Sequence, residues 1–290
     1  MARRPIAGTC ILCRQHSDDL SKEDVIPKWM RKVLPVSGPV QYVNISKDVV
    51  YSTDDTMVLT LRGTVCHKCN NEPLSQLEEL VKPLISDALI GTISAFSADS
   101  QRIIATWAVK EALLIEMACK EIRGYGFAPQ SHFEWLYEVL CRKDPSPPPG
   151  SQVFLGALDP DGLPAWNVAS VFGDKLKHPE SQVAQPIRAD QIIPSAYVAL
   201  FSFGCLVFSV FGQDFRQGTV RPTEYVRPDG VRLGQLQPPT RFSRHLLTIW
   251  PYFHPVVAWP PAARLGVGDL NDFADWRDAR RIVRVPIHKV

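Results

Sequence analysis

Two cysteine pairs with the spacing C-x-x-C constrain the fold of this chain more than any other feature. The first pair is Cys10 and Cys13, and the second pair is Cys66 and Cys69. Four thiolates in two such pairs are the ligand set of a closed, tetrahedral Zn²⁺ site. The chain between the pairs is far longer than the loop of roughly 15–20 residues in a zinc ribbon. We therefore expect one structural Zn²⁺ ion to hold together the ends of a large insertion. Two unrelated clusters of buried thiols are the alternative.

The composition is that of a folded globular protein. Of the 290 residues, 45% are hydrophobic and 21% are charged. A net charge of only +2 argues against a strongly basic nucleic-acid coat protein, so anion binding must come from local patches. Seven cysteines are an odd number, and no apolar leader precedes Cys10, which makes a disulfide framework a poor explanation. We expect a cytoplasmic protein in which Cys119, Cys141 and Cys205 are buried as small apolar residues.

Residues 192–212 form the one stretch apolar enough to resemble a membrane span. Pro194 and Gly204 interrupt it, and Val, Phe and Tyr are frequent in it. This composition favours two buried strands, 197–203 and 206–211, which meet at a turn near Gly204. A transmembrane helix is the less favoured alternative, and we expect no membrane association.

The chain divides into three predicted segments, of which residues 1–92 contain both cysteine pairs. A short helix is expected over 27–33. Residues 41–45 and 57–61 alternate enough in polarity to predict a β-hairpin. Helical spacing over 73–81 follows the second cysteine pair. Hairpin, cysteine pair and helix give a ββα order.

The second segment, 93–143, is predicted to be helical, with helices over 99–122 and 132–140. Lys110 lies on the apolar stripe of the longer helix, and we expect its ammonium to reach water while its stem covers the core. After a proline-rich linker or loop, the third segment, 144–290, is predicted to be mostly β. Its expected strands cover 152–158, 165–171, 197–203 and 206–211, and a last helix covers 269–281. The fold class is therefore α+β, and the sequence indicates no role for the third segment.

A further pattern surrounds the cysteines. Glu23-Asp24-Val25-Ile26-Pro27 lies between the pairs, Asn70 and Asn71 follow Cys69 directly, and Leu74-Ser75-Gln76-Leu77-Glu78 comes next. In this order the motifs resemble the zinc-containing C-x-x-C branch of the HNH, or ββα-metal, endonucleases. The resemblance covers about residues 10–80, with a weaker similarity at 105–110. It implies an N-terminal zinc-stapled ββα-metal domain over 1–92 and hydrolysis of DNA phosphodiester bonds.

The resemblance also implies roles for individual residues. Glu23 and Asn70 would hold one catalytic divalent ion, Mg²⁺ or Mn²⁺, for which carboxylate and amide oxygens are suitable ligands. The family has a histidine as general base where this chain has Asp24. An ordinary aspartate, with a pKa of about 3.9, is a weaker base at neutral pH than an imidazole. Asp24 is therefore expected to be a slow general base, a second metal ligand, or the mark of a site that binds without cleaving.

Basic side chains gather near this motif. They are Lys28, Arg31 and Lys32 on the expected short helix, and Arg14 after the first cysteine pair. Beside a metal site they would bind a phosphate backbone without reading its sequence, although charge clusters on short helices are commonly only solvated. His16 and His67 lie near the cysteines and are expected to face solvent, since four cysteines already complete a tetrahedron.

Three functions follow as hypotheses. The first is a DNA endonuclease, and the second is a catalytically weak or inactive nucleic-acid-binding zinc module. The third is a structural zinc protein without a nucleic-acid partner, in which Glu23 and Asp24 are only surface charges. The sequence indicates no oligomeric state.

Overall fold

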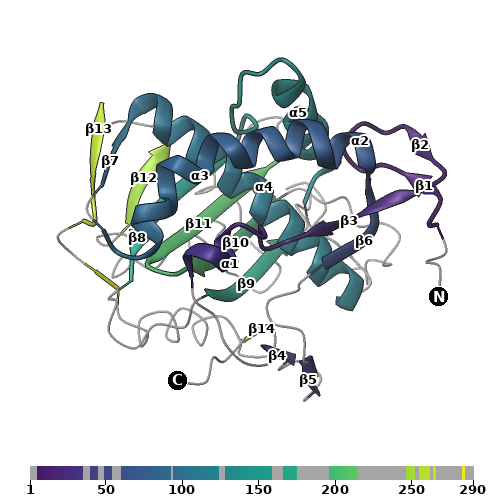
Figure 1. Cartoon of the computed structure of the whole chain (residues 1–290), viewed down its shortest axis with the longest axis horizontal. Coiled ribbons are helices and arrows are strands. Elements are labelled where there is room, and N and C mark those ends of the chain that lie inside the picture. The colour runs from purple at the N-terminus through teal and green to yellow at the C-terminus, as the bar shows by residue number, and fades with distance from the viewer. Residues whose placement is uncertain are drawn as a thin grey trace, which may run out of the picture.

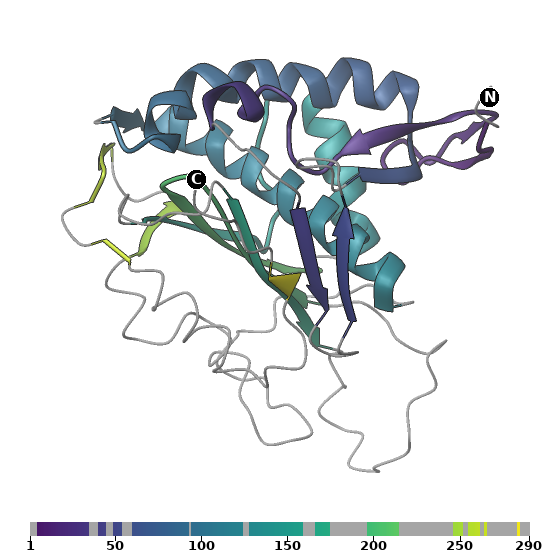
Figure 2. The same ribbon diagram turned by 60° about the horizontal axis from the view of Figure 1, so that its bottom comes forward.

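The computed structural model places helices across one face of an antiparallel sheet (Figures 1 and 2). The residues that it describes are 5–34, 40–44, 49–53, 60–92, 94–123, 128–158, 166–174, 196–214, 246–251, 255–261, 264–265 and 283–284. The predicted α+β class is confirmed at the level of a mixed helix-and-strand fold with the four cysteines near its N-terminus.

The larger sheet has five strands in the order β12-β8-β11-β10-β9, and all neighbours are antiparallel. Their bounds are Gln152–Ala157 (β8), Trp166–Asp174 (β9), Ala196–Phe203 (β10), Leu206–Gln213 (β11) and Leu246–Trp250 (β12). The four strands expected in this part of the chain are confirmed. The apolar stretch that resembles a membrane span supplies β10 and β11, and none of the helices in the described ranges is both long and apolar enough to cross a membrane.

The turn between β10 and β11 requires glycine. Gly204 has a φ of 50°, and a Cβ at this position would lie 2.1 Å from the carbonyl oxygen of Leu89. The same oxygen accepts a hydrogen bond of 2.8 Å from the backbone N–H of Cys205. Because side chains disfavour positive φ and have no space here, only glycine fits. The turn thereby joins the sheet to the end of helix α3, Ser75–Leu89.

Helix α4, Ala98–Arg123, lies between the sheet and α3 (Figure 2). The ring of Trp107 packs 5.7 Å from that of Phe203 and 5.6 Å from that of Phe208, so it joins α4 to β10 and β11. Helix α5, Gln130–Cys141, follows. The helices predicted over 73–81, 99–122 and 132–140 are confirmed by α3, α4 and α5.

The strands between the cysteine pairs do not pair as predicted. β3, Leu20–Asp24, pairs antiparallel with β6, Thr60–Cys66, and β4, Val40–Asn44, pairs with β5, Val49–Thr53. The hairpin predicted between residues 41–45 and 57–61 is therefore wrong. The sequence concealed β3 because Lys, Glu and Asp are its last three residues, a composition that strands disfavour.

Shorter elements complete the described fold. They are β1 (Gly8–Thr9), β2 (His16–Ser17), α1 (Met30–Val33), α2 (His67–Cys69), the π-helical η2 (Asn70–Leu74), β7 (Ser94–Ser97), β13 (Val256–Trp259) and β14 (Val283–Arg284). Helix α1 is shorter than the helix predicted over 27–33. The helix predicted over 269–281 lies outside the described residues.

One hydrophobic core contains residues from all three predicted segments, for example Val25, Trp107 and Phe208. The proline-rich residues 144–150 have no helix or strand, as expected. The division of the chain at 92 and 143 stays a prediction, but the three segments share this core.

Three cysteines outside the pairs were expected to be buried. Cys205 is buried, whereas Cys141 is exposed because it is the last residue of α5 and is followed by exposed polar residues. That expectation is wrong for Cys141. The side chain of Cys119 lies outside the described residues.

Candidate functional site

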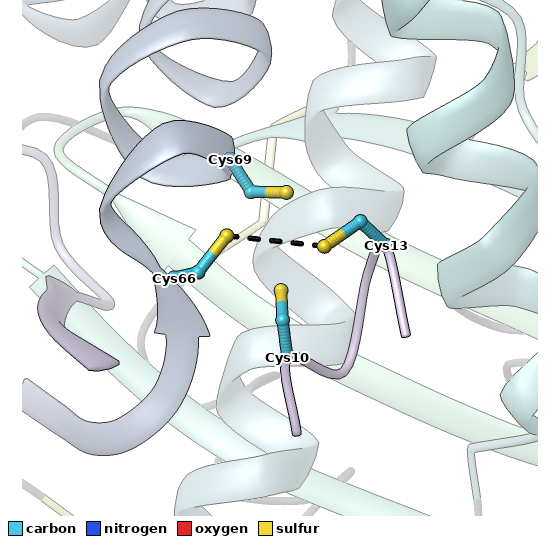
Figure 3. Close-up of side chains that lie close together, drawn as sticks. All are labelled: Cys10, Cys13, Cys66 and Cys69. Atoms are coloured by element: carbon cyan, nitrogen blue, oxygen red, sulfur yellow. Dashed lines mark hydrogen bonds between the residues drawn. The ribbon is translucent and has the colours of Figure 1, made fainter. Parts of the chain in front are cut away.

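The four cysteines of the two pairs lie together (Figure 3). Their sulfur atoms are all within 4.8 Å of one another, and those of Cys13 and Cys66 are 3.8 Å apart. A tetrahedral zinc site with Zn–S bonds of about 2.3 Å separates its sulfurs by about 3.8 Å, whereas a disulfide requires about 2.0 Å. The cluster therefore has the spacing of a site that could hold a zinc ion.

Backbone hydrogen bonds fix the first cysteine pair on its turn. The N–H of Cys10 donates to the carbonyl oxygen of Gln15 at 2.9 Å, and the N–H of Ile11 donates to that of Thr64 in β6 at 3.0 Å. From α5, the side-chain amide of Gln130 donates to the carbonyl oxygen of Ile11 at 2.8 Å. A hydrogen bond with Cys69 lowers the pKa of the Cys10 thiol to about 4, although burial opposes this shift. The turn is thus held in place from two sides, and its buried sulfur favours the thiolate form.

A cleft of about 550 Å³ opens beside the cysteine cluster. Its lining includes six residues that the sequence singled out, namely Glu23, Asp24, Lys28, Lys32, His67 and Asn70. They come from β3, the segment that leads into α1, α1 itself, α2 and η2. Arg14 is not among the lining residues, and the side chain of Arg31 lies outside the described residues.

Asn70 is oriented by its amide nitrogen. Nδ2 donates to the Ser21 hydroxyl oxygen at 3.1 Å and to the Lys22 carbonyl oxygen at 3.4 Å. The Ser21 hydroxyl in turn donates to the carbonyl oxygen of Val65, which links β3 to β6 at 2.7 Å. Both bonds of Asn70 use its nitrogen, so Oδ1 remains the atom that can accept a hydrogen bond or bind a cation.

Asp24 and the two histidines each have a charged neighbour. Asp24 Oδ2 lies 3.3 Å from Lys28 Nζ. His67 Nε2 is 3.5 Å from Asp19 Oδ2, and the side chains of His67 and His16 are exposed, as expected. The sequence did not indicate that His67 lies at the cleft.

The sequence-based reasoning missed one residue of this site, Lys110 of α4. Its ammonium Nζ lies 2.7 Å from Glu78 Oε1, 2.9 Å from Glu111 Oε1 and 3.7 Å from Glu23 Oε1. Its side chain is only 1% exposed, so the expectation that the ammonium reaches water is wrong. Three carboxylates from β3, α3 and α4 take the place of that water. A usable signal was the adjacent charged pair Lys110-Glu111 within an otherwise apolar helical stretch.

Burial dominates the ionisation of this buried group. It raises the pKa of Glu23 to about 7 and that of Glu111 to about 8, although the charge of Lys110 acts against both shifts. For Lys110, burial alone would lower the pKa. The charges of Glu111, Glu78 and Glu23 outweigh burial and raise it. The ammonium is therefore charged at neutral pH, and it is shared among more carboxylates than it can neutralise.

The cleft offers hard oxygen donors for a divalent ion. Glu23, Asp24, Glu78 and the amide oxygen of Asn70 suit Mg²⁺ or Mn²⁺. Apart from the cysteines, the described part of the chain contains no cluster of three or more acidic, histidine or cysteine ligands that could hold an ion. The fit is therefore to an ion held by one or two carboxylates, an amide and water, which is the usual manner of Mg²⁺.

Comparisons of the chain with protein-family models, with curated proteins and with solved structures found no match. The resemblance to HNH endonucleases thus rests on the motifs, and the argument for function rests on the site.

Proposed function

We propose that the chain is an HNH-like, divalent-ion-dependent endonuclease that hydrolyses DNA phosphodiester bonds in this cleft. One observation carries the proposal. Glu23, Asp24 and Asn70, which the motif resemblance singles out from two distant parts of the sequence, line one cleft beside the four-cysteine cluster. In this proposal the cysteines hold a structural Zn²⁺ ion, and β3, β6 and α3 form the ββα unit around it.

Glu23 and Asn70 would hold the catalytic ion. When bound, Mg²⁺ or Mn²⁺ supplies Lewis-acid stabilisation of the charge that develops on the phosphate and on the leaving oxygen. Asp24 would accept the proton of the attacking water from its place on the same cleft. Positioned general bases contribute about 10²–10⁴-fold to rate, and an aspartate gives less of this than a histidine at neutral pH. We therefore expect slow cleavage.

Lys28 and Lys32 would bind the DNA backbone. The Lys28 side chain is 81% exposed, so its ammonium can exchange the Asp24 carboxylate for a phosphate without loss of packing. Such a contact positions the substrate without reading its sequence, and it would free Asp24 to accept a proton.

A second function is favoured by one specific observation. Asp24 stands where the resembling family has its base, and it is already paired with Lys28 at 3.3 Å. If that pair persists, the chain would be a nucleic-acid-binding zinc module that does not cleave.

Nicking of supercoiled plasmid in Mg²⁺ or Mn²⁺ tests both functions. We would compare the native chain with Asp24→His and Asn70→Ala, and use Gln76→Ala, an exposed amide on α3 outside the cleft, as the matched control. The endonuclease proposal predicts slow nicking by the native chain and by Gln76→Ala, faster nicking by Asp24→His, and none by Asn70→Ala. Cleavage by Asp24→His alone would select the binding module. No cleavage by any variant would refute the endonuclease proposal.

A further inference from the structure

Lys110 has no role in the proposed function as stated above, yet two of its three partners line the cleft. Glu23 and Glu78 are lining residues, and Lys110 is bound to both from behind. Glu111, the third partner, is adjacent to it on α4 and is fully buried. The ammonium is therefore anchored within one helix and contacts carboxylates from two other elements.

This arrangement is costly for a residue that only fills the core. A buried ammonium loses its hydration, and an apolar side chain at the same place commonly stabilises a protein as well or better. The residues on either side of Lys110 and Glu111, Val109 and Ala112, are buried and apolar. In addition, Glu111 Oε2 is buried and has no hydrogen-bond partner in the part of the chain that the structure describes. Packing of α4 therefore does not account for this group of charges.

We propose that Lys110 is a positioning residue of the cleft, which holds Glu23 and Glu78 so that both carboxylates face the same divalent ion. Lys110 contacts one oxygen of each carboxylate, which leaves the other oxygen of each for the ion. Glu78 thereby joins Glu23 and Asn70 as a ligand, either directly or through a bound water. The inference rests on the proposed function, because it assumes that the cleft takes such an ion.

The expected effect is a loss of metal affinity. Loss of a group that orients a metal ligand typically weakens metal binding about 10–100-fold. We would measure Mn²⁺ binding to the full, zinc-loaded chain by the electron paramagnetic resonance signal of free Mn²⁺, which gives affinity and stoichiometry without turnover. Asn70→Ala serves as the reference for loss of binding in the cleft.

The decisive variant is Lys110→Met combined with Glu111→Gln. It removes one positive and one negative charge, so the formal charge of the buried group is unchanged and any change in affinity reports lost positioning. Lys82→Met with Glu138→Gln is the matched control, because it makes the same two changes at residues outside the cleft lining. We expect 10–100-fold weaker Mn²⁺ binding by the decisive variant and unchanged binding by the control.

Glu78→Gln provides a second test if the double variant does not fold. Its side chain is 21% exposed at the cleft, so it tolerates an isosteric amide. We expect at least 10-fold weaker Mn²⁺ binding, with the circular dichroism spectrum and the zinc content unchanged. Native affinity in either folded variant would overturn the positioning role and leave the proposed function standing. Absence of Mn²⁺ binding by the native chain would overturn both.

Discussion

His132 is expected to make the stability of this protein depend on pH. Its ring is fully buried, Nε2 donates to the Gln213 carbonyl oxygen at 2.7 Å, and Nδ1 lies 3.4 Å from the Tyr197 hydroxyl. Burial lowers the pKa of His132 from 6.5 to about 4, against the opposing influence of Gln213 and Asp214. The folded state therefore keeps the ring neutral over a pH range in which the unfolded chain binds a proton.

The sign and the size of the effect follow from this difference. The stability that His132 contributes is present above the unfolded pKa of about 6.5 and is lost as the pH falls towards the folded value of about 4. One pKa unit corresponds to about 1.4 kcal/mol, so the loss across this window is about 3 kcal/mol. Glu23 and Glu111 act in the opposite direction. Their raised pKa values favour folding when they are protonated, and that stability is lost as the pH rises through about 7 and about 8.

A comparison of variants separates these contributions. We would measure the free energy of unfolding by urea denaturation from pH 4.5 to 7.5 for the native chain and for His132→Gln. The difference between the two should shrink by about 2–3 kcal/mol as the pH falls, because only the native chain loses the His132 contribution. His16→Gln is the control, since the His16 side chain is 67% exposed. Parallel pH profiles for the native chain and His132→Gln would refute the assignment.

Three further predictions concern the cysteine cluster, the Gly204 turn and the cleft. Removal of zinc by a chelator, or Cys66→Ser, should lower the melting temperature but leave most of the far-ultraviolet circular dichroism, because α4 and the sheet have their own core; complete unfolding would contradict this. Gly204→Ala should destabilise the chain by at least about 1–3 kcal/mol in thermal unfolding, because of the positive φ and the clash with Leu89, and a neutral effect would contradict the turn geometry. Lys28→Ala and Lys32→Ala should each reduce by about 1 the slope of log affinity against log salt for duplex DNA, whereas Lys82→Ala, outside the cleft lining, should not.

The sequence predicted those parts of the fold in which local pattern decides the structure. Apolar residues at helical spacing located α3, α4 and α5, and the density of Val, Phe and Tyr located β10 and β11. Strand β3 was missed because its side chains read as a charged loop. Its register with β6 is set by residues that lie beyond a long insertion. Local composition cannot supply such a pairing.

The candidate site divides in the same way. The motif residues Glu23, Asp24 and Asn70 were recognisable because they lie at short, fixed distances from the cysteines. Lys110 was misjudged because a lysine on an apolar stripe normally extends to water, and nothing near it in the sequence shows that Glu23 and Glu78 will lie beside it. The resemblance ends near residue 80, but the carboxylate that it assigns to the metal is held by an ammonium from α4. The electrostatics of the cleft therefore belong to the first two predicted segments together, and the chemistry proposed for the motif depends on a helix outside it.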